Sequence, residues 1–102
     1  MQRKNKVYAG IDKDVFGGMS PNGTLIRDAW VFGLLSETET CAGWTPDQFQ
    51  VLYDRVYHAW EPYGHLASKL PPDLAERHQH IHGAAITRAR ELGWSAELSD
   101  DD

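Results

Sequence analysis

Residues 24–35, Thr-Leu-Ile-Arg-Asp-Ala-Trp-Val-Phe-Gly-Leu-Leu, form the densest apolar run of this 102-residue chain. Wound as a helix, the run carries apolar side chains on nearly every side, and a helix of that kind is normally buried. We therefore expect a central buried helix over 24–35, capped at its start by the Thr24 hydroxyl. Residues 30–35 also fit a buried strand, and the pattern alone leaves that alternative open.

Two further helices are predicted downstream, over residues 46–60 and 72–92. Thr45-Pro46-Asp47-Gln48 has the residue types of a capping box with proline at the first helical position, and Pro62 favours an end near residue 61. Apolar residues then recur at helical spacing: Phe49, Leu52, Tyr53, Val56 and Trp60. Pro71-Pro72 opens the third helix and Gly93 ends it, with a second apolar line at Leu74, Ile81, Ala85 and Leu92.

The chain is therefore predicted to be one small all-α domain of three main helices. The helical domain spans 24–94 and follows an irregular N-terminal arm, 1–23, in which residues 7–11 favour a short extended segment. Residues 95–102 end in acidic side chains and are predicted to be a disordered tail.

Bulk composition narrows the function classes. The formal charge is −5, which disfavours nucleic-acid binding because phosphates attract a surplus of Lys and Arg. The chain has one cysteine and so cannot form an intramolecular disulfide, which favours a reducing compartment. No apolar stretch approaches the ~20 residues of a membrane span, and the N-terminus lacks the apolar segment of a secretory signal. We expect a soluble cytoplasmic protein without a membrane partner, of an oligomeric state that the sequence leaves open.

His78 and His82 are the candidate metal ligands. They lie four residues apart on the third predicted helix, so both rings can face the same way, and His78 falls about 40° from the apolar line through Leu74. Two ligands are too few for zinc, which normally takes three or four, so a third would come from His65, Glu39 or Cys41. The alternative is structural, with His78 packed at a helix contact. No other cofactor is indicated.

Cys41 is the single candidate nucleophile, and its neighbours argue against that role. A reactive thiolate needs a nearby cation, histidine or helix N-terminus, whereas Glu37 and Glu39 precede Cys41. These carboxylates are expected to raise the pKa of the thiol. A partly buried structural thiol is the favoured interpretation.

Arg27 and Asp28 interrupt the central apolar run, so each is expected to find a partner rather than to remain a lone buried charge. Arg27 can meet Glu37 or Glu39, and Asp28 can accept a hydrogen bond from a tryptophan indole or a histidine. Ions that anchor loops are the structural interpretation. A place in a ligand site is the functional one.

Aromatic residues give the strongest functional signal, because four Trp and four Tyr are many for so small a core. Most should be buried, but an exposed subset would form a partner-binding surface, since Trp, Tyr and Arg dominate interface hot spots. The predicted surface joins the loop before the second helix, that helix and the turn after it. Its candidate residues are Trp44, Tyr57, Trp60, Tyr63, His65, Arg27 and Asp28.

Three runs resemble a small bacterial family of uncharacterised proteins: Arg27-Asp28-Ala29-Trp30-Val31-Phe32-Gly33, Glu37-Thr38-Glu39-Thr40-Cys41, and Ala59-Trp60-Glu61-Pro62-Tyr63-Gly64-His65-Leu66. The resemblance implies a bacterial cytosolic setting and assigns no activity. The sequence thus favours a non-enzymatic binding or accessory module that uses an aromatic surface for a protein partner. The alternative is a metal-binding protein or metal-dependent enzyme, with a divalent metal such as zinc on His78 and His82.

Overall fold

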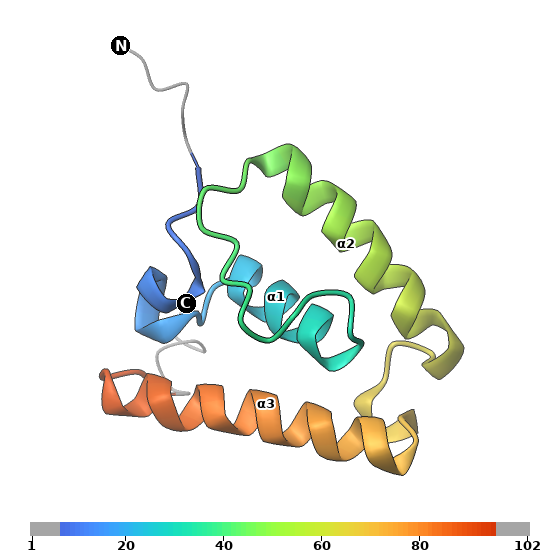
Figure 1. The fold of residues 1–102 in the computed structure, drawn as a ribbon. Helices are drawn as coiled ribbons and strands as arrows, with labels where there is room; N and C mark the ends of the chain where they lie inside the picture. The colour runs from blue at the N-terminus through green and yellow to red at the C-terminus, as the bar shows by residue number, and fades with distance from the viewer. Residues whose placement is uncertain (1–6, 96–102) are drawn as a thin grey trace.

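The computed structural model describes residues 7–95, and three α-helices dominate them (Figure 1). No strand is present within this part of the chain. The prediction of a small all-α domain is confirmed, and the alternative of a buried strand over 30–35 is wrong. The helices are α1 (Pro21–Val31), α2 (Pro46–Trp60) and α3 (Pro72–Glu91), and the 3-10 turns are η1 (Ile11–Lys13), η2 (Val15–Gly17), η3 (Glu61–Tyr63) and η4 (Ala67–Lys69).

Helix α1 begins and ends earlier than the predicted range of 24–35. Ser20, not Thr24, is the N-cap: its hydroxyl oxygen accepts a hydrogen bond from the Gly23 amide at 3.0 Å, and Pro21 takes the first helical position. At the other end, α1 stops at Val31 and residues 32–33 form a turn, in which Gly33 has φ 73°; residues 34–35 form a bend. The apolar run therefore supplies both a helix and the turn that follows it.

Gly23 holds the start of α1 against the segment before it. A Cβ atom at this position would lie 2.0 Å from the carbonyl oxygen of Gly18. Such an approach is possible only for glycine. The last turn of the N-terminal arm therefore packs directly against the start of α1.

Helix α2 has the predicted bounds and the predicted capping box. The Thr45 amide donates to the Gln48 side chain at 2.9 Å, and the Gln48 amide donates back to the Thr45 hydroxyl. Phe49, Leu52 and Val56 are buried, as expected from their spacing. Tyr53 was predicted to belong to the same buried line, but its side chain is 52% exposed because it sits at the rim of that face.

Helix α3 begins at the predicted proline and ends at Glu91, one residue earlier than predicted. Gly93 follows with φ 103°, which is the left-handed conformation expected after a helix. Ile81 and Ala89 are its buried side chains. Leu92 was predicted on the apolar line, yet it is 45% exposed because it lies past the last helical residue.

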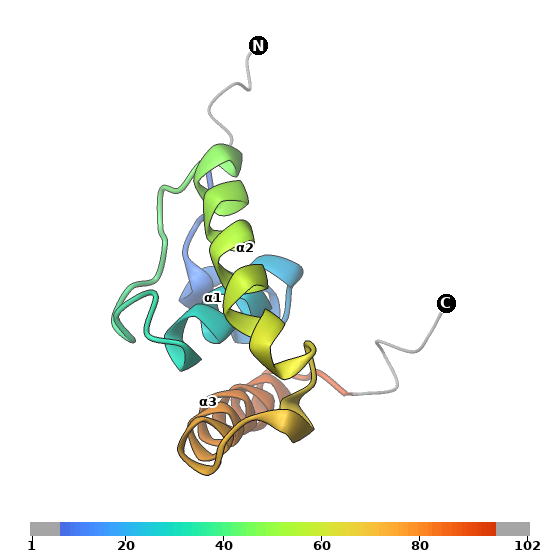
Figure 2. The ribbon, with the colours of Figure 1, turned by 90° about the vertical axis from the view of Figure 1, so that its right-hand side faces the viewer.

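Helix α1 lies between α2 and α3, and both contact it (Figures 1 and 2). One buried cluster joins α1, α2 and the N-terminal arm through Ile11, Ile26, Cys41 and Phe49. A second joins α1 and α2 alone, through Ala29, Leu52 and Val56. The core therefore sits mainly on the α2 side of α1.

The start of the described arm is extended and pairs with the loop before α2. The Tyr8 amide donates to the Trp44 carbonyl at 2.9 Å, and the Gly43 amide donates back to the Tyr8 carbonyl at 2.7 Å. The predicted extended segment over 7–11 gives way to η1 at its last residue. Residues 1–6 of the predicted arm and 96–102 of the predicted tail lie outside the described residues.

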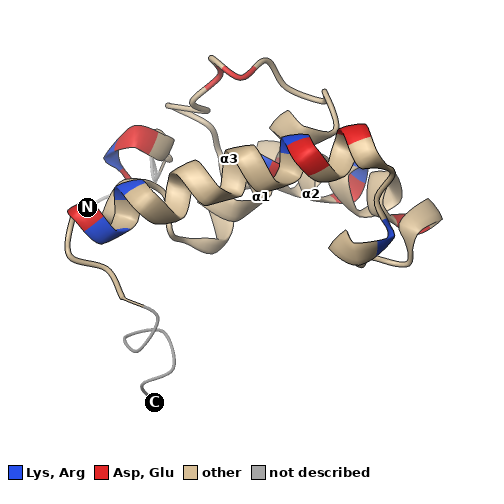
Figure 3. Ribbon diagram, turned by 90° about the horizontal axis from the view of Figure 1, so that it is seen from below, with Lys and Arg blue, Asp and Glu red and all other residues tan. Residues whose placement is uncertain are grey.

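Charges on α3 gather toward its two ends, as seen from below (Figure 3). Asp73, Glu76 and Arg77 lie in its first two turns, and Arg88, Arg90 and Glu91 in its last. Between them, residues 78–87 carry no Asp, Glu, Lys or Arg, and they include His78 and His82. None of the helices in residues 7–95 has the length and apolar character needed to cross a bilayer.

Candidate binding groove and the Asp28 cluster

An aromatic groove of about 1160 Å³ runs between the start of α1 and α2. We call it the α1–α2 groove. Its apolar wall comes from the N-terminal arm, the loop before α2 and α2 itself, and its opposite wall comes from the first turns of α1. Its aromatic lining residues are Tyr8, Trp44, Phe49, Tyr53, Tyr57 and Trp60.

Helical spacing places the exposed aromatics of the groove on one face of α2. Tyr53 and Tyr57 are one turn apart, their ring centroids are 6.2 Å apart, and the Tyr57 side chain is 46% exposed. The His65 ring packs against the Tyr57 ring, with the two ring centroids 4.5 Å apart. Gly64 and His65 both have positive φ, 62° and 60°, so two left-handed residues turn the chain back toward α2. The left-handed backbone conformation is energetically unfavourable for His65, and it brings the His65 ring to the groove.

Five of the seven residues predicted for a binding surface line this groove: Asp28, Trp44, Tyr57, Trp60 and His65. Tyr63 lies elsewhere, with its ring stacked on Phe32 at 6.3 Å and 9° between planes. Arg27 points to the other side of α1, where it lines a smaller cavity of about 310 Å³ with Ile81 and Arg88. The groove therefore collects most of the predicted aromatic residues but excludes the arginine.

Asp28 ties the three helices together. Its Oδ1 atom is 2.8 Å from the Nε2 atom of His82 on α3, and its Oδ2 atom accepts from the Trp60 indole of α2 at 3.3 Å. The side chains of Asp28 and His82 are 17% and 20% exposed, so this pair is largely shielded from solvent. Both partner types predicted for Asp28, an indole and a histidine, are present at once.

His78 completes a cluster with Asp28 and His82. Its ring centroid is 4.4 Å from that of His82 and 5.8 Å from that of Trp60. One ligand atom from each of Asp28, His78 and His82 lies within 4.8 Å of the other two. Burial lowers the pKa of His78, and so does nearby His82, while Asp28 acts in the opposite direction. A lowered pKa keeps this ring neutral, which is the form that binds metals.

The residues predicted as a third metal ligand lie elsewhere. His65 packs on Tyr57, the Glu39 carboxylate accepts from the Cys41 amide at 2.9 Å, and Cys41 belongs to the buried cluster of Ile11 and Ile26. The structure instead brings Asp28 to the two histidines. Sequence reasoning paired His78 with His82 and named Asp28, but it did not add Asp28 to the pair as a ligand, because Asp28 and His82 are far apart in the chain.

Arg27 is buried without the predicted carboxylate partners. Its side chain is 4% exposed, with Nη1 donating to the Gly18 carbonyl at 2.7 Å and Nη2 to the Thr24 hydroxyl at 3.3 Å. Burial lowers its pKa, although Asp28 works against that change. Thr24 was expected to cap α1, but its hydroxyl instead accepts a hydrogen bond from Arg27. Through its hydrogen bond to the Gly18 carbonyl, the Arg27 guanidinium joins the end of the N-terminal arm to α1.

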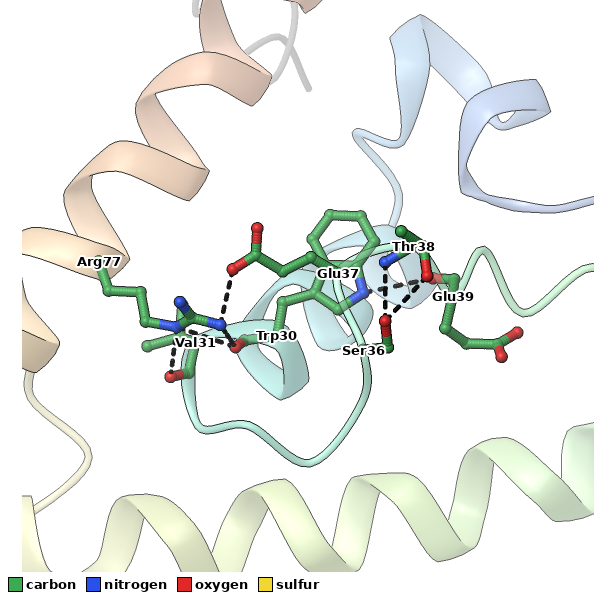
Figure 4. Close-up of polar contacts among 7 residues, drawn as sticks. All are labelled: Trp30, Val31, Ser36, Glu37, Thr38, Glu39 and Arg77. Carbon is green, nitrogen blue, oxygen red and sulfur yellow. Dashed lines mark hydrogen bonds and ion pairs between the residues drawn. The ribbon is translucent and has the colours of Figure 1, made fainter.

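Glu37 pairs with Arg77 on α3 instead of Arg27, at 2.6 Å (Figure 4). The same guanidinium donates from Nη2 to the Trp30 carbonyl at 2.9 Å and from Nε to the Val31 carbonyl at 3.1 Å. Arg77 therefore caps the C-terminal end of α1, where a cation is favoured. Arg77 was not among the residues predicted from the sequence. No local pattern marks it, because its partners are backbone carbonyls of a distant helix.

Cys41 has the properties of a structural thiol. It is fully buried, and burial raises its pKa to about 11, with a further contribution from the Glu39 carboxylate. A raised pKa leaves little thiolate at neutral pH, so the side chain is a poor nucleophile. The direction expected from the neighbouring carboxylates is confirmed, although burial is the larger cause.

Comparison of the chain with protein-family models, curated proteins and solved structures finds no match. The resemblance to a bacterial family therefore stays a prediction, and so does the cytoplasmic setting.

Proposed function

We propose that this protein is a non-enzymatic binding module and that its α1–α2 groove takes a segment of a protein partner. The segment carries a cationic side chain among apolar ones. One observation carries the proposal: a large groove lined by aromatic rings contains the Asp28 carboxylate, and no Lys or Arg of residues 7–95 lines it.

Apolar contact supplies the first part of the expected affinity. The Tyr57 ring packs against the rings of Tyr53 and His65, while Tyr53 and Tyr57 stay 52% and 46% exposed to a ligand. Rigid tyrosine and tryptophan side chains at the centre of a concave surface are typical hot spots of protein interfaces. An apolar side chain of the partner is therefore expected to pack across Tyr53 and Tyr57.

The negative charge of Asp28 supplies the expected specificity for a cationic side chain of the partner. Aromatic faces attract an Arg or Lys of a ligand, and a ring with a nearby carboxylate attracts it more strongly. Asp28 uses one contact on each carboxylate oxygen, so each oxygen keeps a further lone pair for a donor from the groove. An anionic ligand would find no Lys or Arg of the described residues along the groove.

Two matched peptides test the proposal. One is a short acetylated and amidated peptide with two leucines flanking an arginine, and its twin carries glutamine in place of arginine. Isothermal titration should show saturable binding of the first peptide and about two- to fivefold weaker binding of the twin, the range expected for losing one exposed cation–aromatic contact.

Variants of α2 locate the binding. Tyr57→Ala should weaken binding of the arginine peptide at least about fivefold, as expected for a hot spot. Val51→Ala is the matched control, because Val51 is 61% exposed on the same helix and does not line the groove. Equal losses in the two variants, or equal affinity for the two peptides, would contradict the proposed groove specificity.

A further inference from the structure

We propose that Asp28, His78 and His82 form a binding site for a Zn²⁺ ion between α1 and α3. The site shares Asp28 with the α1–α2 groove, whereas His78 and His82 do not line that groove. It uses two imidazole nitrogens and one carboxylate oxygen, a ligand set that zinc takes in proteins.

The three ligand atoms lie close enough that a small movement would bring them around one ion. The three ligand atoms lie within 4.8 Å of one another, and two of them, Asp28 Oδ1 and His82 Nε2, are already 2.8 Å apart. Zinc–ligand bonds of about 2.0 to 2.2 Å place the ligand atoms of a tetrahedral site about 3.3 Å apart. A zinc site of that size would need the His78 nitrogen to move toward Asp28, and the ion would take the place of the hydrogen between Asp28 and His82.

The surroundings orient the ligands. The Trp60 indole donates to Asp28 Oδ2, which fixes the carboxylate and leaves Oδ1 toward the histidines. Such outer contacts to the ligands are a usual feature of metal sites. His78 and His82 are one helical turn apart on the middle of α3, so a rigid element presents both rings to the same point.

His78 is otherwise unexplained by the packing. Within residues 7–95, the histidines whose ring nitrogens form hydrogen bonds are His58 and His82. The half-buried His78 ring is thus held between Trp60 and His82 without a polar partner among the described residues. A ring nitrogen without a hydrogen-bond partner is one that a metal ion could use.

Three protein ligands leave one coordination position of a tetrahedral ion for water. The site would therefore be of the open type rather than the closed four-ligand type. Binding would also join α1 to α3 at Asp28, so zinc should stabilise the folded chain.

Titration of the untagged, EDTA-treated full chain with zinc chloride tests the proposal, followed by NMR of the five histidine rings. The expected result is one equivalent of zinc with coupled shifts of His78 and His82. The NMR signals of the His58, His65 and His80 rings should not shift. Weak shifts of all five rings, or no shift, would overturn the site.

Substitutions distinguish the site from general histidine binding. His78→Ala should weaken zinc binding at least tenfold, whereas His80→Ala should leave it unchanged, because His80 is exposed on the same helix and outside the cluster. Asp28→Asn keeps a hydrogen-bonding group of the same size and should also weaken binding at least tenfold. Circular dichroism confirms folding of each variant, and equal zinc affinity of folded His78→Ala and His80→Ala would overturn the proposal. Asp28 belongs to both proposed sites, whereas His78 belongs to the zinc site alone and Tyr57 to the groove alone. Zinc and peptide binding by His78→Ala and Tyr57→Ala therefore distinguish failure of one proposal from failure of the other.

Discussion

The two sides of α1 are covered in different ways. Toward α2 the contact is apolar, through Ala29, Leu52 and Val56, and it leaves the aromatic α1–α2 groove beside it. Toward α3 specific polar contacts join the buried Ile81 side chain, with Arg77 on the last carbonyls of α1 and His82 on Asp28. The apolar side thus provides both stability and uncovered aromatic surface, whereas the polar side fixes orientation through a few specific groups.

The largest stability effect is expected on the α2 side. Leu52 is 2% exposed and packs against Ala29 and Val56, so Leu52→Ala should lower the free energy of unfolding by about 2 to 5 kcal/mol. Urea denaturation followed by tryptophan fluorescence measures the change. The surface variant Val51→Ala should change it by less than about 0.5 kcal/mol. A loss below about 1 kcal/mol for Leu52→Ala would show that the α2 contact is not the main source of stability.

A smaller effect is expected on the α3 side. Arg77→Met removes the donors to the Trp30 and Val31 carbonyls and the pair with Glu37, at an expected cost of about 1 to 2 kcal/mol. Arg88→Met is the control on the same helix, since its pair with Glu91 is exposed at 3.7 Å and should contribute less than about 0.5 kcal/mol. Equal losses in the free energy of unfolding for Arg77→Met and Arg88→Met would contradict a stabilising role of the Arg77 cap on α1.

The smallest effect concerns pH, measured without zinc and in the presence of EDTA. The pKa of His78 is lower in the folded chain than in the unfolded chain, so the unfolded chain binds more protons as pH falls. The contribution of His78 to stability is therefore fully present above its unfolded pKa of about 6.5, and it is lost as pH falls through the folded pKa. Urea midpoints at pH 7.5 and 5.0 should differ more for the wild-type chain than for His78→Phe. A larger pH dependence in His78→Phe would contradict this sign.

Local sequence signals predicted the helices better than they predicted the contacts between them. The capping box at Thr45 and the proline at the start of α3 depend only on neighbouring residues, and both helix starts were placed correctly. The start of α1 was predicted three residues late, because that prediction followed the apolar content of 24–35. Ser20-Pro21 is in fact a cap followed by a first helical proline.

The site required information that no local pattern holds. Asp28 and His82 were each identified as candidates for polar partners, but only the packing of α3 on α1 shows that they meet. Arg27 was expected at a carboxylate and instead uses the Gly18 carbonyl, an acceptor that every residue has and no sequence marks. Aromatic content predicted a surface, and the fold decided which rings line one groove.

The four tryptophans provide the most direct test of the groove, because each indole N–H gives its own NMR signal. Trp44 and Trp60 line the α1–α2 groove, Trp30 lines the smaller cavity on the other side of α1, and Trp94 lines neither. During titration with the arginine peptide, the indole signals of Trp44 and Trp60 should shift together while those of Trp30 and Trp94 stay in place. Shifts centred on Trp30 or Trp94, or no shift in any indole at saturating peptide, would contradict the proposed binding groove.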